Sequence, residues 1–251
     1  MCTLLLLRRP SDPWPLLLAG NRDEMGDRPW RPPGRHWPDR PDIVAGQDEL
    51  AGGSWLGIND HGVAACILNR YGSLGPAAGK RSRGELVLEA LDHADAAAAA
   101  AALAHLEPAA YRSFNLVIAD SRDAFWLRHL GEDAESVIVQ PLPPGFSMIT
   151  AADRNDMKSP RIGHFLPKFR NARIPDPSKG VWDAWESLLA SRDHDPAVGP
   201  EGAMNVALPN GFGTVSSSLI ALAAPSGDRA ESLWRFAAGA PDSARYETVA
   251  L

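Results

Sequence analysis

Cysteine is scarce in this chain, which has two among its 251 residues, Cys2 and Cys66. Two thiols so far apart give neither a metal-ligand spacing nor a disulfide framework. We therefore expect no metal site, no cofactor and a reducing compartment, the cytoplasm. Cys66 lies inside an apolar run and is typical of an unreactive core thiol. Cys2 is the thiol that remains as a candidate for chemistry.

Long apolar runs and an excess of positive charge are also missing. The leucines at 4–7 are followed by Arg8 and Arg9, so the run is too short for a signal peptide and has the wrong charge order. No run approaches the roughly 20 residues of a membrane helix. The net charge is -6 and the basic residues are scattered arginines, which argues against a nucleic-acid partner. We expect a soluble protein that binds a small molecule, and a homo-oligomer is compatible with this composition.

The order of periodic segments indicates one layered domain spanning residues 1–251. A capping-box pattern at Ser82 and Glu85 predicts a helix start, and the alanine tract at 96–102 favours a second helix. The segment 26–50, rich in Pro, Arg and Trp, is expected to be an ordered loop lining a cleft. Two antiparallel sheets with helices outside them, an α+β fold, follow from this order. The other predicted helices are 159–169 and 181–190, and the predicted strands are 4–7, 16–20, 53–58, 62–69, 114–120, 124–129, 136–140, 145–150, 211–222, 232–236 and 245–249.

Cys2 can act as a nucleophile without a separate histidine. If Met1 is removed, the thiol and the α-amino group belong to one residue, and the amine can serve as general base. Their ordinary pKa values, roughly 8.5 and about 8, are close enough for proton transfer near neutral pH. The alternative is an ordinary thiol packed on an edge strand.

Four polar residues, Asn21, Arg22, Asp23 and Glu24, end the second predicted strand. The predicted hairpin between 4–7 and 16–20 brings the chain back beside Cys2. A carboxylate there can accept a hydrogen bond from an ammonium group, and a guanidinium group near a thiol favours the thiolate. The alternative is a salt-bridged turn at the surface.

Three segments together resemble a known family: Met1-Cys2-Thr3, the Asn-Arg-Asp-Glu tetrapeptide at 21–24, and the run WLGINDHG at 55–62. This is the NRDE family, also called the transport and Golgi organisation protein 2 family. It looks like a branch of the N-terminal nucleophile (Ntn) hydrolases, related to cysteine-type acylases that cleave penicillin V and conjugated bile salts. The resemblance implies a four-layer αββα sandwich with mature Cys2 at the start of a central strand.

The resemblance also implies roles for individual residues. Arg22 and Asp23 match the pair that holds the nucleophile and its amine, although the acylases space that pair differently. Asn69 matches an oxyanion-hole amide, a contribution of roughly 3 kcal/mol, and Asn155 matches a second asparagine of the site. As alternatives, Asn69 is an ordinary turn residue and Asn155 belongs to a helix-entry loop. Val215 stands where many relatives have a polar or basic residue.

Two functions follow as hypotheses. The first is a hydrolase acting on carbon–nitrogen bonds other than peptide bonds, which cleaves a linear amide, or a thioester, through an acyl-enzyme at Cys2. Substrate contacts are assigned to Asn21, Trp30, Trp37 and Arg70, with the two tryptophans forming an apolar wall. The second is a carrier of the same fold for a hydrophobic metabolite such as haem or acyl-CoA, which would tolerate Cys2→Ser. A redox thiol protein is a distant third hypothesis.

Overall fold

A computed structural model describes residues 2–131, 134–224 and 232–251. The chain divides into two compact units, each built around one antiparallel sheet. The first unit contains residues 2–28, 144–223 and 232–249, and the second contains most of 29–143. The expectation of one domain stays a prediction.

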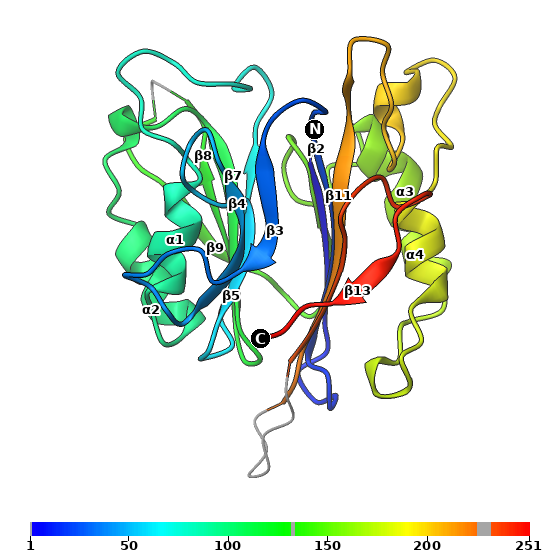
Figure 1. Cartoon of the computed structure of the whole chain (residues 1–251), viewed down its shortest axis with the longest axis horizontal. Coiled ribbons are helices and arrows are strands. Elements are labelled where there is room, and N and C mark those ends of the chain that lie inside the picture. The colour runs from blue at the N-terminus through cyan, green and yellow to red at the C-terminus, as the bar shows by residue number, and fades with distance from the viewer. Residues whose placement is uncertain (1, 132–133, 225–231) are drawn as a thin grey trace. The chain divides into compact units, whose positions relative to one another are not determined.

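The sheet of the first unit has six strands in the order β10-β1-β2-β11-β12-β13. Helices α3 and α4 pack against it through β10 and β2 (Figure 1). Strand β11 lies beside β2, so the end of the chain's second strand is joined to a segment almost 200 residues later. The elements are β1 (Thr3–Arg8), β2 (Leu16–Met25), β10 (Gly145–Ile149), α3 (Pro160–Asn171), α4 (Asp183–Leu189), β11 (Phe212–Leu222), β12 (Leu233–Ala237) and β13 (Tyr246–Thr248).

Strand β1 is buried on both faces, which explains its unbroken leucine run. Leu5 and Leu7 pack with Phe165 of α3 and Trp185 of α4 in the core on the helix side of the sheet. Leu4 and Leu6 alternate with them and are equally buried, and successive side chains of a strand point to opposite faces. The residue that precedes β1, Cys2, is therefore held by a strand that packs on both sides.

The sheet of the second unit has seven strands in sequence order, β3 to β9. Helices α1 and α2 cover one of its faces (Figure 1). The two antiparallel sheets with their helices confirm the predicted α+β class. The elements are β3 (Trp30–Gly34), β4 (Ile43–Asp48), β5 (Leu56–Asn59), β6 (Ala64–Asn69), α1 (Glu85–Leu91), α2 (Ala96–Leu103), β7 (Phe114–Ala119), β8 (Ala124–His129) and β9 (Ile138–Pro141); short 3-10 turns lie at Pro108–Ala110, Pro177–Lys179 and Pro200–Gly202.

The loop predicted at 26–50 is wrong in part, because β3 and β4 lie within it. Strand β3 pairs with β4 through Trp30 and Arg31, and the register shifts before Gly34. Its two prolines are tolerated because β3 is the edge strand, where a missing N–H leaves no ladder bond unmade. The prolines obscured the strand period in the sequence.

The helix predicted to start after Ser82 is confirmed as α1, but the predicted capping box does not form. Helix α1 begins at Glu85 after Gly84, with no side-chain cap, and the Ser82 hydroxyl accepts only the Gly84 N–H. The helix start is fixed by tertiary contact instead: Ser54 N–H donates to Gly84 O, and a Cβ on Gly53 would lie 2.4 Å from the Gly84 carbonyl carbon. The helix predicted over the alanine tract is confirmed as α2, with Asp95 capping it.

His129, at the end of β8, makes the second unit sensitive to acid. It is fully buried and stacks on Phe114 with ring centroids 5.5 Å apart. Burial, with a smaller contribution from Lys80, lowers the pKa of His129. The unfolded chain therefore binds this proton more readily than the folded chain, and stability is lost as the pH falls below the unfolded value of about 6.5.

We expect the free energy of unfolding to fall with decreasing pH below about 6.5, by at most about 1.4 kcal/mol per pH unit from this residue. Urea unfolding of the wild type and of His129→Gln over that range measures the slope. The variant should have the shallower slope. Equal slopes would show that His129 does not carry the effect.

No helix in the described part of the chain combines the length and the hydropathy that a membrane crossing needs.

Candidate active site

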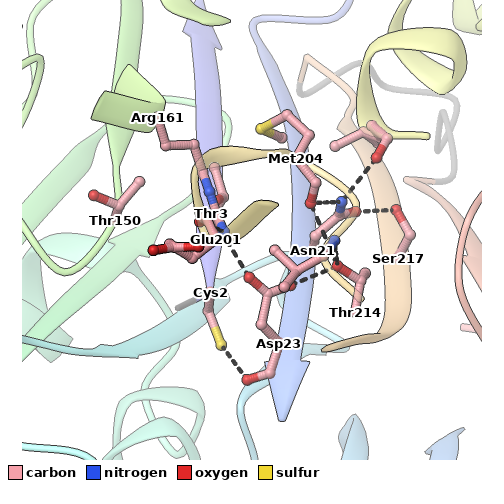
Figure 2. A network of polar contacts seen from close by, with 12 residues as sticks. Cys2, Thr3, Asn21, Asp23, Thr150, Arg161, Glu201, Met204, Thr214 and Ser217 are labelled. Carbon is pink, nitrogen blue, oxygen red and sulfur yellow. Dashed lines mark hydrogen bonds and ion pairs between the residues drawn. The ribbon is translucent and has the colours of Figure 1, made fainter. Parts of the chain in front are cut away.

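Cys2 lies directly before β1, opposite the polar end of β2. Thr3 pairs with Asn21, so the antiparallel register places Cys2 beside Arg22. The Cys2 side chain is half-buried, and its thiol donates to the main-chain oxygen of Asp23 at 3.7 Å (Figure 2). Met1, whose removal we expect, lies outside the described residues.

The surroundings of Cys2 favour its neutral thiol. Burial raises the pKa of the Cys2 thiol, the Asp23 carboxylate raises it further, and the Arg22 guanidinium lowers it. A base is therefore needed to form the thiolate near neutral pH.

Strand alternation splits the Asn-Arg-Asp-Glu tetrapeptide between the two faces of the sheet. Asn21 and Asp23 point toward α3 and α4, where their side chains find partners. Arg22 has the opposite parity and therefore shares the face of Cys2. The two members of the predicted Arg–Asp pair therefore lie on opposite faces of the sheet. The Arg22 guanidinium group is on the same face as the Cys2 thiol, and the Asp23 carboxylate is on the face covered by the helices.

The Asp23 carboxylate is held by two donors. Arg161 Nη1 donates to Oδ2 at 2.8 Å, and Thr214 Oγ1 donates to Oδ1 at 2.7 Å (Figure 2). The side chains of the ion pair are 2% and 0% exposed. The alternative of a salt-bridged surface turn is wrong for Asp23, since its ion pair is buried.

Arg161 is not among the site residues predicted from the sequence. It lies in the first turn of α3 and also donates to Thr3 Oγ1 and to the main-chain oxygen of Glu201, both at 2.9 Å. The available signal was an arginine one turn before Phe165 on the apolar stripe of the helix, where a charge needs a buried partner.

Asn21, predicted to contact substrate, is bonded within the protein. Its Nδ2 donates to the main-chain oxygens of Leu189 and Met204, and its Oδ1 accepts from the Ser217 hydroxyl. These bonds join β2 to the end of α4, to the segment before β11, and to β11 (Figure 2).

A β-bulge at Val215 lies opposite the tetrapeptide. Thr214 pairs with Asp23 while Ser216 pairs with Arg22, so Val215 is the extra residue in β11. A bulge reverses which residues face each side. Thr214 therefore reaches the Asp23 carboxylate, and Ser216 lies on the face of Arg22 and Cys2.

Asn155 lies in the turn after β10, with the one positive φ, 55°, among the non-glycine residues described. Its Oδ1 accepts from Met148 N–H at 2.7 Å, and its Nδ2 donates to Phe146 O at 3.0 Å. Strand β10 pairs with β1, so these contacts hold the turn against the strand beside the cysteine strand.

The other predicted residues belong to the second unit. Asn69 is the last residue of β6 and pairs with Phe114. By strand alternation its side chain lies on the same face of the sheet as Ile67, and this is the face that the helices cover. Arg70 belongs to the other face, where its Nη1 donates to Asn115 Oδ1 at 2.7 Å; Trp126 donates to the same oxygen.

The two predicted tryptophans pack near the edge of the second sheet. Trp30 meets Trp55 edge to face at 5.7 Å. Trp37 packs against the core on the helix side of the sheet and donates to Gly52 O. Each of the two indole rings therefore packs against other residues of the protein.

In the part of the chain that the structure describes, no group of three or more His, Cys, Asp or Glu side chains is placed to hold a metal ion.

A sequence model of the family described as Transport and Golgi organisation 2 matches residues 1–173. The chain belongs to the Transport and Golgi organisation 2 family. The predicted NRDE family is therefore confirmed, and the matched residues include the whole of the tetrapeptide, Asn69 and Asn155. No curated protein sequence matches the chain.

Three solved structures similar to this member of the Transport and Golgi organisation 2 family have the Ntn-hydrolase fold. Penicillin V acylase from Agrobacterium tumefaciens is 14% identical, with a TM-score of 0.50 over 95% of this chain and 83% of that chain. The Caenorhabditis elegans orthologue of N-acylethanolamine-hydrolyzing acid amidase is 14% identical, with a TM-score of 0.53 over 87% and 92%. A variant of conjugated bile acid hydrolase from Clostridium perfringens is 11% identical, with a TM-score of 0.53 over 100% and 97%. The likeness confirms the Ntn-hydrolase fold class.

Proposed function

We propose that this chain is a cysteine Ntn hydrolase that cleaves a linear amide, or a thioester, through an acyl-enzyme at Cys2 after removal of Met1. The observation that carries the proposal is the position of Cys2. Its thiol lies at the head of a doubly buried strand, beside Arg22, and donates to the main chain of Asp23. The similar structures are an acylase, an amidase and a bile acid hydrolase, which favours an amide as the substrate.

The proposed reaction begins with proton transfer from the Cys2 thiol to the α-amine of the same residue. The thiolate attacks the acyl carbon, and a tetrahedral intermediate with an oxyanion forms. The protonated amine gives its proton to the leaving nitrogen, the C–N bond breaks, and a thioester remains on Cys2. Water, deprotonated by the same amine, attacks the thioester and releases a carboxylic acid and the free thiol.

Each assigned residue has a proposed part in this reaction. Arg22 favours the thiolate from the face of Cys2, and Asp23, held by Arg161, orients the amine. Asn155, which lies in the same unit as Cys2, is the proposed oxyanion donor. Asn69 of the second unit is assigned that role by the family resemblance alone. The amide nitrogen of Asn155 has two hydrogens. One is donated to Phe146 O, and the other is the one proposed to donate to the oxyanion.

The proposed substrate contacts are of two kinds. Trp30 and Trp37 offer apolar surface for an acyl chain or an aromatic group, and Arg70 offers a charged donor. Asn21, with both amide hydrogens given to main-chain oxygens, supports the site by holding the end of β2.

A panel of acyl substrates tests the proposal. The panel contains linear N-acyl amides of a chromogenic amine and acyl thioesters, each with short, long and aromatic acyl groups. We expect turnover of at least one substrate, with a rate that rises toward alkaline pH, because burial raises the pKa of the Cys2 thiol.

The contrary result would be saturable binding of an acyl ligand with neither turnover nor a covalent adduct. That outcome would favour the carrier hypothesis, with a hydrophobic metabolite such as haem or acyl-CoA as its cargo.

A further inference from the structure

A single nitrogen of Arg161 contacts two residues that adjoin Cys2. Its Nη1 donates to Thr3 Oγ1 at 2.9 Å and to Asp23 Oδ2 at 2.8 Å (Figure 2). Thr3 is the next residue of the chain after Cys2, and Asp23 supplies the main-chain oxygen that accepts the thiol. The guanidinium group thus reaches both strands next to the thiol from the opposite face of the sheet.

We propose that Arg161 is a positioning residue for the Cys2 nucleophile, acting through Thr3 and Asp23. This inference rests on the proposed function of Cys2. The Thr3 side chain fixes the main chain from which the thiol projects, and the Asp23 side chain fixes the main chain that receives it. Because a misplacement of about 1 Å can cost about a hundredfold in rate, these contacts bear directly on catalysis.

The anchors of the network are themselves well held. Arg161 Nη2 donates to Glu201 O, so the guanidinium group is fixed by acceptors on three segments. Thr214 accepts a hydrogen bond from Val206 N–H and donates to the Asp23 carboxylate. Side chains held by several directed bonds keep a site in its reactive geometry.

Charge gives Arg161 a second effect on the thiol. The Asp23 side chain is 0% exposed, and its negative charge raises the pKa of Cys2. The positive charge of Arg161 at 2.8 Å offsets that charge. Without it, Asp23 would act on the thiol uncompensated, and the thiol would ionise at higher pH.

The pH dependence of Cys2 alkylation tests the inference. Iodoacetamide is the probe, the modified residue is located by mass spectrometry, and each variant is studied below its melting temperature. The variants are Arg161→Gln, which removes the charge, Arg161→Lys, which keeps it, and Thr3→Val, which removes one acceptor. The matched control is Arg170→Gln, an exposed arginine of the same helix.

We expect Arg161→Gln to move the alkylation midpoint to higher pH. Alkylation near neutral pH should slow by about tenfold for every pH unit by which the midpoint rises. Arg161→Lys should restore most of the wild-type midpoint. Thr3→Val should leave the midpoint unchanged and lower kcat severalfold with little change in KM. Arg170→Gln should match the wild type in alkylation midpoint, alkylation rate, kcat and KM.

The inference is overturned if folded Arg161→Gln and Thr3→Val both keep the wild-type midpoint, alkylation rate and kcat. Should Arg161→Gln not fold, Thr3→Val decides the question, since wild-type kcat in that variant would overturn the inference. A wild-type Cys2 that reacts no faster than Cys66 is a different failure, because it contradicts the proposed function itself.

Discussion

The Arg161→Met variant is expected to lose about 3 to 5 kcal/mol of unfolding free energy, which is the usual effect of removing one partner from a buried ion pair. The loss arises because the Asp23 carboxylate stays buried without its 2.8 Å partner. Thr3 Oγ1 and Glu201 O lose a donor at the same time. Urea unfolding at neutral pH gives the measurement.

The double variant Arg161→Met/Asp23→Leu separates the buried charge from the lost packing. Removing both charges should recover much of the stability, because an apolar pair of similar volume needs no ionic partner. Arg173→Met is the matched control: it breaks an ion pair of the same 2.8 Å length whose side chains are 64% and 72% exposed, where little change is expected. A loss equal to the control would contradict a stabilising role for the buried pair.

Cys2→Ala should lower kcat by about 10⁴-fold or more against any substrate that the wild type hydrolyses, as removal of a catalytic nucleophile does in other hydrolases. The variant keeps its α-amine, so it has a base without a nucleophile. Cys2 is half-buried and small, and we expect its removal to leave the melting temperature nearly unchanged. Steady-state kinetics with the most active substrate of the panel gives the measurement.

Cys66→Ala is the control, since Cys66 lies on β6 between Val117 of β7 and Leu56 of β5. Its turnover should equal that of the wild type. If Cys2→Ala retained wild-type turnover, the thiol would not be the nucleophile.

The β1–β2 hairpin could be predicted because the residues that specify it are close together in the sequence. An unbroken leucine run followed by a turn and a second apolar run specifies the β1–β2 hairpin. The register Thr3 to Asn21 then follows, and it places the tetrapeptide beside Cys2. The family could be inferred for the same reason, since its motifs lie close together in the sequence.

The parts that escaped prediction depend on distant contacts. Arg161 meets Asp23 across 138 residues of chain, and no local pattern predicts that contact. Strand alternation predicts the face of the sheet on which the Asp23 side chain lies. The residues that donate to its carboxylate come from α3 and from the bulged strand β11, which are far away in the sequence. Strand β3 escaped prediction for a similar reason. Its prolines are compatible with a strand only at the edge of a sheet, and its edge position depends on pairing with β4.

Mass spectrometry of the purified protein, before and after incubation with a slowly hydrolysed acyl amide, tests whether Cys2 is the nucleophile. A nucleophilic Cys2 requires a chain that lacks Met1 and begins at Cys2, with one acyl group added at Cys2 and lost again on standing. A chain that retains Met1, or an acyl group found elsewhere with Cys2 unmodified, would contradict this role of Cys2.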